Sequence, residues 1–250
     1  MKSSIIIAIV LFFAVHQSWS QENTSSKIPL IGADAPSFTA HSTNGEITFP
    51  GDFGNKWKIL FSHPADFTPV CSSEILELAQ MQPDFDKLGV KIAVMSTDTL
   101  YKHYSWKKSL ETIKYKDRDP VTINFPLIDD NSWYASKEYG MLHSNVSSQK
   151  DVRGVFIIDP KNKVRAIYFY PMEIGRNMEE IRRTVVALQT ADSHKVETPA
   201  NWEPGQDVLI PYVKSIDEVQ NLGTGKDKDM YQLSWYMTFK KLNPTSTNEK

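Results

Sequence analysis

The chain has 250 residues, of which 28 are basic and 30 are acidic, so its formal net charge at pH 7 is −2. This near balance gives little support for nucleic-acid binding, because the basic pairs are isolated and are most simply solvated; they are Lys107-Lys108, Arg182-Arg183 and Lys240-Lys241. Hydrophobic residues make up 40% of the sequence, which is ordinary for a soluble globular protein.

The first twenty residues have the three parts of a secretory signal peptide. Lys2 supplies the positive charge, residues 5–15 form an uncharged apolar run, and Ser18-Trp19-Ser20 places small residues before an expected cleavage at Gln21. A retained anchor is the alternative, but the apolar run is short for a membrane span. We therefore predict that residues 1–20 are a signal peptide and that the mature protein is exported, periplasmic or secreted, without membrane attachment.

From Pro36 to about residue 190, strand and helix patterns alternate. The pair Asn44-Gly45 predicts a hairpin turn within residues 38–49. Five further strands are expected at residues 58–62, 90–96, 125–128, 153–158 and 164–170, and four helices at residues 71–88, 101–113, 132–139 and 178–188. This alternation predicts an α/β layered domain.

After residue 190 the pattern is broken by prolines and glycines, with short apolar pieces between them. The segment is nevertheless too rich in aromatic residues to be disordered. These residues are Trp202, Tyr212, Tyr231, Trp235, Tyr236 and Phe239. We expect a small second unit over residues 191–243.

Cys71 is the only cysteine of the sequence. An intrachain disulfide is therefore impossible, and so is CxxC chemistry within this chain. Exported proteins often pair their cysteines, so a single exported thiol is either an intermolecular linker or a reactive group.

Cys71 lies where an expected strand, residues 57–62, gives way to a helix. Thr68 is a suitable N-cap and Pro69 suits the first helical position, which places Cys71 at the third position of the first turn. The free N–H groups and the dipole there favour an anion, so the thiol should ionise more readily than a free one. A lone cysteine is most often a small buried hydrophobe, but this combination, with Pro64, favours a reactive residue.

The pattern Pro64-x-x-x-Thr68-x-x-Cys71 resembles the active-site motif of the peroxiredoxins. The longer run Phe61-Ser62-His63-Pro64-x-Asp66-Phe67-Thr68-Pro69-Val70-Cys71 is similar to the one-cysteine subgroup with an extended C-terminal domain. The resemblance covers residues 28–242. It implies a thioredoxin-like fold of the peroxiredoxin type over residues 28–190, followed by a small C-terminal domain over residues 191–243 that packs across a homodimer.

The resemblance also implies roles for four residues. Cys71 is the expected nucleophile, Thr68 donates a hydrogen bond to the peroxide or thiolate, Pro64 shields the pocket, and Arg153 is the cation beside the thiolate. The three roles other than that of Cys71 each have a plainer alternative: Thr68 as an N-cap only, Pro64 as a loop proline, and Arg153 as a solvent-facing residue at the head of a strand.

Three other residues are expected to support this cluster. Arg176 matches a second arginine of the family. His63 and Glu74 are expected around it, although His63 is as readily a structural histidine. The six histidines show no metal-ligand spacing, and neither a metal nor a cofactor is expected.

One departure from the subgroup concerns a second, phospholipase-like activity that some relatives carry. That activity uses a serine just before the tryptophan of the active-site strand, whereas here Lys56 precedes Trp57. The sequence also contains no G-x-S-x-G elbow. We therefore predict no lipase activity.

The resemblance implies reduction of hydrogen peroxide and organic hydroperoxides through a sulfenic acid on Cys71, in antioxidant defence. With no second cysteine, the reductant must be an external thiol, either a small molecule or a thioredoxin-like protein. Two alternatives stay open. One is an idle scaffold with a binding or chaperone-like role, and the other is a sensor that passes oxidation to a partner.

Overall fold

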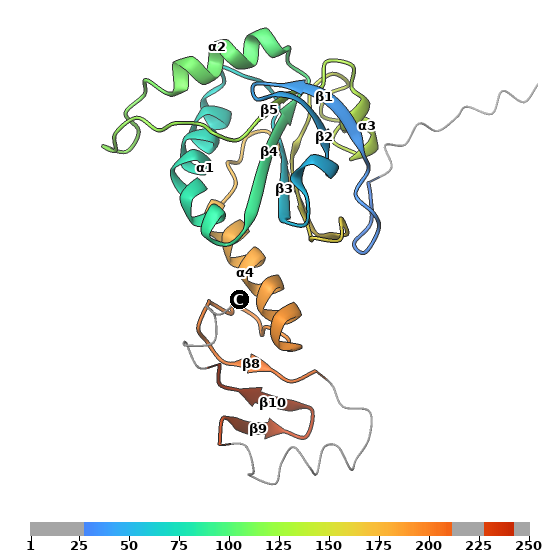
Figure 1. The fold of residues 1–250 in the computed structure, drawn as a ribbon, viewed down its shortest axis with the longest axis vertical. Helices are drawn as coiled ribbons and strands as arrows, with labels where there is room; N and C mark the ends of the chain where they lie inside the picture. The colour runs from blue at the N-terminus through green and yellow to red at the C-terminus, as the bar shows by residue number, and fades with distance from the viewer. Residues whose placement is uncertain (1–27, 212–227, 243–250) are drawn as a thin grey trace, which may run out of the picture.

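The computed structural model describes residues 28–211 and 228–242 (Figure 1). The predicted signal peptide, residues 1–20, and the aromatic Tyr212 lie outside the described residues. Within them, no helix has the length and apolar character that a membrane crossing needs.

The larger part of the structure is a seven-stranded mixed sheet with the order β2-β1-β5-β4-β3-β6-β7. Its strands are β1 (Phe38–Ser42), β2 (Gly45–Phe49), β3 (Trp57–Ser62), β4 (Val90–Ser96), β5 (Leu127–Asp129), β6 (Arg153–Ile158) and β7 (Val164–Tyr170). The central strands β3, β4 and β5 are parallel, and the other pairs are antiparallel. The predicted hairpin of β1 and β2 is confirmed.

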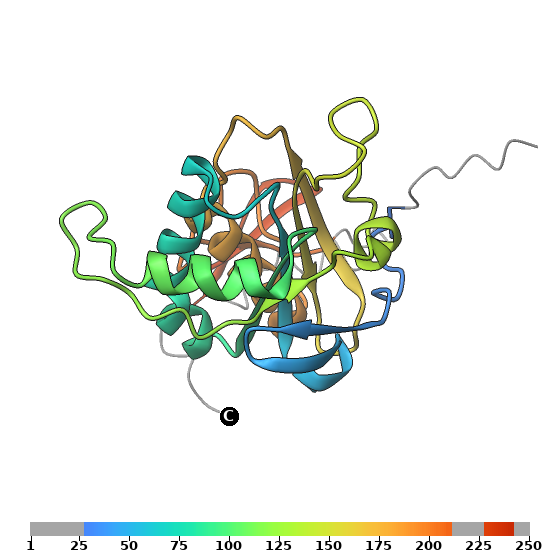
Figure 2. The ribbon, with the colours of Figure 1, turned by 90° about the horizontal axis from the view of Figure 1, so that it is seen from above.

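Helices connect the parallel strands and cover the sheet. They are α1 (Pro69–Lys87), α2 (Leu100–Leu110), α3 (Tyr134–Glu138) and α4 (Met178–His194), with a short 3-10 helix at Gly51–Phe53. Helix α1 joins β3 to β4, and α2 joins β4 to β5. Seen from above, α1 and α3 lie on opposite sides of the sheet (Figure 2).

Three predicted boundaries were too wide. Strand β5 begins at Leu127 because Pro126 has no N–H to give to a ladder. Helix α2 ends at Leu110, since the next residues form tighter turns in which Ile113 N bonds Leu110 O at 3.0 Å. Helix α3 begins only after Trp133, which has a left-handed φ of 61°.

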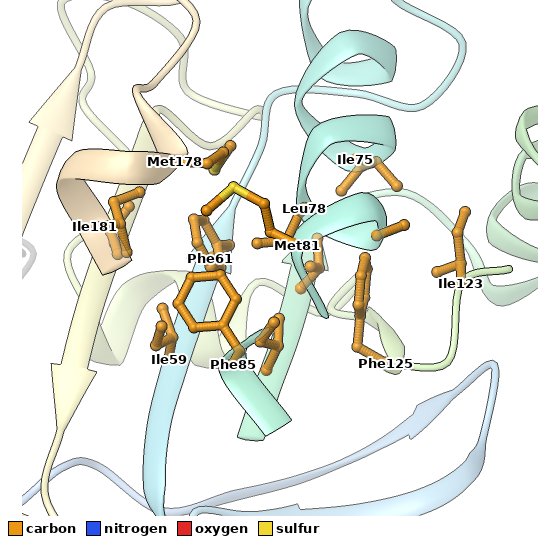
Figure 3. Packing of buried hydrophobic residues seen from close by; sticks show 14 of the residues in the cluster. Ile59, Phe61, Ile75, Leu78, Met81, Phe85, Ile123, Phe125, Met178 and Ile181 are labelled. Atoms are coloured by element: carbon orange, nitrogen blue, oxygen red, sulfur yellow. The ribbon is translucent and has the colours of Figure 1, made fainter. Parts of the chain in front are cut away.

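Both faces of the sheet are buried, which explains why its central strands read as continuous apolar runs. Along β3, Ile59 and Phe61 belong to one core cluster and Leu60 to the other, as the two-residue period of a strand requires. The first cluster fills the space between β3, α1 and α4, where Phe61 lies near Met178 and Leu78 (Figure 3). These packed faces fix the end of β3 and the start of α1 relative to each other.

Helix α4 extends past the sheet toward a separate three-stranded sheet (Figure 1). The strands of that sheet, in the order β8-β10-β9, are β8 (Val208–Leu209), β9 (Met230–Ser234) and β10 (Met237–Lys240). A small core joins it to α4 through Ala187 and Trp202, which is 1% exposed. One helix therefore contributes side chains both to the main core and to the small core of the C-terminal unit.

Candidate active site

Cys71 lies in the first turn of α1, directly beyond the carboxyl end of β3. The connecting loop turns at Phe67, which has a left-handed φ of 59°, and the helix then begins at Pro69. Pro69 at the first helical position and Cys71 at the third confirm the local register read from the sequence. Pro64 is buried in the same loop.

The predicted capping bond of Thr68 was wrong. Thr68 occupies the N-cap position with extended backbone angles, but its side chain accepts no hydrogen bond from the helix. Its hydroxyl donates instead to the carbonyl oxygen of Ala65 at 2.8 Å. An acceptor three residues earlier in the same loop competes with the helix for this side chain.

The Cys71 side chain is fully buried, with 0% exposure. Burial alone would raise the pKa of the thiol, but the close approach and charge of the His63 ring lower it, as do Thr68 and the backbone of Ala65. The result is a pKa of about 6. At neutral pH this cysteine is therefore a thiolate, the form that reacts as a nucleophile.

Arg153 reaches Cys71 from β6. Its Nη1 lies 3.3 Å from the Cys71 sulfur and also donates to Glu74 Oε2 at 2.7 Å. Its Nε and Nη2 both donate to the carbonyl oxygen of Met172, at 2.9 and 2.6 Å. Since Arg153 is only 2% exposed, the alternative of a solvent-facing arginine at the head of the strand is wrong.

Arg176 holds the other side of Glu74. Its Nε donates to Glu74 Oε1 at 2.8 Å and its Nη2 to Oε2 at 2.7 Å, while Nη1 bonds the carbonyl oxygens of Ser62 and Gly154. Burial would raise the pKa of Glu74, but Arg176 and then Arg153 hold it below its usual range. Two guanidinium groups thus face one carboxylate and one thiolate, so the buried charges balance.

His63 is 1% exposed and lies against the ring of Trp106, with 5.0 Å between ring centroids. Its Nε2 is 3.5 Å from Oδ1 of Asp66. Burial would lower the pKa of His63, but Cys71 and Asp66 raise it above its usual value. His63 is therefore a charge partner of the thiolate, which is a more direct place than the supporting one expected from the sequence.

Several groups around the site were not expected from the sequence. Asp66, His103 and Trp106 lie around His63, and the Met172 carbonyl accepts hydrogen bonds from Arg153. Asp151, close to Arg153 in sequence, is fully buried, and neither of its carboxylate oxygens has a hydrogen-bond partner among the described residues. Burial raises the pKa of Asp151 to about 8.

Lys56 is exposed at the opposite end of β3 from Cys71. The position at which some relatives carry a lipase serine is thus separated from the thiolate by the whole length of the strand. The absence of a lipase activity stays a prediction.

Comparisons with known proteins agree with this geometry. Residues 31–167 match the AhpC/TSA family, and residues 187–225 match the C-terminal domain of 1-Cys peroxiredoxin. A peroxiredoxin of Methanosarcina mazei is 47% identical over 215 residues, which cover 86% of this chain and 98% of that protein. The mitochondrial peroxiredoxin PRX1 of Saccharomyces cerevisiae is 42% identical over 197 residues, 76% of this chain and 74% of that protein.

Solved structures give the same result. The structure of the yeast mitochondrial 1-Cys peroxiredoxin matches with a TM-score of 0.76 and 39% identity, covering 86% of this chain and 100% of that one. Peroxiredoxin 6 of Arenicola marina matches with a TM-score of 0.74 and 31% identity, over 86% and 99% of the two chains. The predicted thioredoxin-like fold of the peroxiredoxin type, with its C-terminal domain, is confirmed. The chain belongs to the one-cysteine peroxiredoxins of the AhpC/TSA family and is a thiol-dependent peroxidase.

Proposed function

We propose that Cys71 reduces hydrogen peroxide and organic hydroperoxides by direct attack on the terminal peroxide oxygen. A sulfur–oxygen bond forms as the oxygen–oxygen bond breaks, and the sulfur becomes a sulfenic acid. The leaving oxygen departs with the bonding electron pair, takes a proton, and is released as water or an alcohol. The observation that carries the proposal is the 3.3 Å contact between the buried Cys71 sulfur and Arg153 Nη1.

Three neighbours of Cys71 are assigned the other catalytic roles. Arg153 is held by Glu74 and Met172 before any substrate arrives, so it can stabilise negative charge on the peroxide without reorganising. Thr68 can turn its hydroxyl from Ala65 toward a bound peroxide oxygen. Pro64 shields the sulfur from bulk water, which strengthens each of these electrostatic interactions.

The sulfenic acid is reduced by an external thiol, because Cys71 is the only cysteine of the sequence. The first thiol forms a mixed disulfide with Cys71 and releases water, and a second thiol restores the cysteine. A small molecule or a thioredoxin-like protein can fill this role. The solved structure of the yeast relative is described in terms of glutathione and thioredoxin systems, which supports this choice.

We also propose that the mature protein is an exported homodimer. Strand β7 lies at an edge of the main sheet, where its backbone can pair with a second chain. The C-terminal sheet adds exposed apolar side chains at Leu233, Trp235 and Tyr236, which are 58–68% exposed. Export rests on the signal-like residues 1–20 and is tested by the N-terminal sequence of the secreted protein.

The decisive experiment is stopped-flow oxidation of reduced residues 21–250 by hydrogen peroxide. We expect a fast change that saturates at one equivalent, disappears in Cys71→Ser and is slowed in Thr68→Val. Ser73→Ala, which removes a nearby hydroxyl that donates to Val70 O, should react like the wild type. A reaction no faster than that of a free small thiol would overturn the proposal.

Two alternatives predict different results. A binding or chaperone-like scaffold keeps its function in Cys71→Ser, and a sensor forms a mixed disulfide with one specific protein. The buried contact of Cys71 with Arg153 favours the peroxidase over the scaffold, because an idle scaffold has no need of an activated thiolate.

A further inference from the structure

A chain of buried polar groups leads from His63 through Asp66 to His103. His103 Nδ1 is 2.7 Å from Asp66 Oδ2, and Asp66 Oδ1 is 3.5 Å from His63 Nε2. The side chains of Asp66 and His103 are 0% exposed and that of His63 is 1% exposed. His103 comes from α2, so a helix remote in sequence from the motif reaches the charge partner of Cys71.

The hydrogen-bonding atoms fix how this chain is arranged. His103 Nε2 lies 3.0 Å from the carbonyl oxygen of Ile128, which can only accept, so this nitrogen carries a proton. His103 Nδ1 and Asp66 Oδ2 share a further proton at 2.7 Å. His103 is thereby anchored to β5 and holds one oxygen of Asp66, which turns the other oxygen toward His63.

The main chain of Asp66 is fixed as well. Its N–H donates to Asp98 Oδ2 at 2.6 Å, and Asp98 Oδ1 pairs with Lys102 Nζ at 2.7 Å. Asp66 is therefore held at its backbone by Asp98, just before α2, and at its side chain by His103, within α2. Lys102 and His103 are adjacent on that helix.

His63 itself has few other restraints. Neither of its ring nitrogens makes a hydrogen bond of ordinary geometry among the described residues, and its ring rests on Trp106. The charged groups that face it are Cys71 and Asp66, which favour a protonated ring, and Arg176, which opposes one. Asp98 and Asp151 also interact electrostatically with it. Asp66 is thus the neighbour that can set the orientation and charge of His63.

We propose that His103 is a positioning residue for peroxide reduction, which acts through Asp66 to hold the His63 ring, protonated, beside the Cys71 thiolate. The proposal deepens the proposed function and rests on it for the reaction served. What it adds is a series of contacts that begins at the carbonyl oxygen of Ile128 and reaches Cys71. The side chains in this series are those of His103, Asp66 and His63.

The test measures the pKa of the Cys71 thiol directly, from the pH dependence of its alkylation by iodoacetamide, with no peroxide present. His103→Leu removes both hydrogen bonds, and we expect the thiol pKa to rise by about one unit or more as the opposite charge is lost. His103→Asn keeps an amide N–H that can donate to Asp66, so its thiol pKa should stay near the wild-type value.

Leu110→Ala is the matched control for helix stability. Leu110 is 1% exposed on the same helix and contributes only packing, so this variant should melt at a lower temperature with an unchanged thiol pKa. If His103→Leu fails to fold, Asp66→Asn replaces it, since it removes the carboxylate at nearly constant shape and should raise the thiol pKa similarly.

An unchanged thiol pKa in folded His103→Leu would overturn the proposal, and so would an equal rise in Leu110→Ala. Because the titration needs no substrate, its outcome is separate from that of the peroxidase assay. The wild-type protein could react slowly with peroxide and still lose its low thiol pKa in His103→Leu. That result would contradict the proposed function and support the positioning role.

Discussion

Arg153 Nη1 and Cys71 Sγ are 3.3 Å apart, although the two residues are 82 positions apart in the sequence. The guanidinium reaches the sulfur while all three of its nitrogens are engaged by Glu74 and the Met172 carbonyl. A cation fixed in this way costs little reorganisation when charge develops on a peroxide.

Replacement of Arg153 by lysine should therefore be severe. Lysine is a point charge without the planar fork, so it cannot bind Met172 O, Glu74 and the sulfur together. We expect the second-order rate constant for hydrogen peroxide to fall by more than about tenfold in Arg153→Lys. Arg165→Lys, at a partly exposed pair with Asp192, is the matched control and should react normally. Equal rates in the two variants would contradict this role of Arg153.

The pH dependence of the reaction follows from the thiol. Because the pKa of Cys71 is about 6 and the thiolate is the reactive form, the rate constant should rise with pH, reach half its maximum near pH 6 and level off above pH 7. Stopped-flow traces from pH 4.5 to 8.5 measure this. A rate still climbing steeply at pH 8.5 would show an unactivated thiol.

Glu74 is predicted to stabilise the fold at neutral pH. Its folded-state pKa is depressed, so its contribution is present above the unfolded pKa of about 4.3 and is lost as the pH falls through the folded value. Glu74→Gln leaves two buried guanidinium groups without their carboxylate, and we expect a loss of about 3 kcal/mol at pH 7 by urea unfolding. Glu77→Gln, at a more exposed pair with Arg118, should cost under about 1 kcal/mol. Equal losses would show that burial of the pair is unimportant.

Thr68 allows catalysis and capping to be separated. Its hydroxyl does not cap α1, so Thr68→Val should change the unfolding free energy by less than about 1 kcal/mol while it slows peroxide reduction. Thr68→Ser keeps the hydroxyl and should retain most of the rate. If Thr68→Ser and Thr68→Val were equally slow, the methyl group rather than the hydroxyl would be the important part.

Asp151 should make the protein less stable as the pH rises. Its folded-state pKa of about 8 is above the unfolded value, so the stability present in acid declines from about pH 4 to pH 8, by about 1.4 kcal/mol per pH unit. Asp151→Asn should flatten this part of the curve in thermal or urea unfolding. Asp119→Asn, whose side chain is 94% exposed, should follow the wild type. An unchanged slope in Asp151→Asn would mean that Asp151 ionises normally.

The sequence was informative where the determinants are local. The preferences of threonine for the N-cap and of proline for the first helical position depend only on neighbouring residues. The helical positions of Pro69 and Cys71 could therefore be predicted. The Thr68 hydroxyl was misassigned, because a cap and a bond to Ala65 O are both local options of similar strength. Arg153 could be identified only by resemblance, since its burial depends on the packing of β6 against β3.

Longer-range contacts that the family resemblance did not supply could not be predicted. The pairing of Asp66 with His103 joins residues 37 positions apart and depends on how α2 lies on the sheet. Asp151 likewise gave no sign of its burial, because a charged residue in a polar loop usually faces water.

Two of the hydrogen bonds that Arg153 donates, those from Nε and Nη2, end on the main-chain carbonyl of Met172 and not on a side chain. Every amino acid has a main-chain carbonyl, so residue 172 can be substituted without loss of the contact. The number of residues between Tyr170 and Arg176 is constrained, because one insertion or deletion would move the carbonyl away from the guanidinium. In the evolution or engineering of this enzyme, the segment should therefore tolerate substitution freely and resist any change in length.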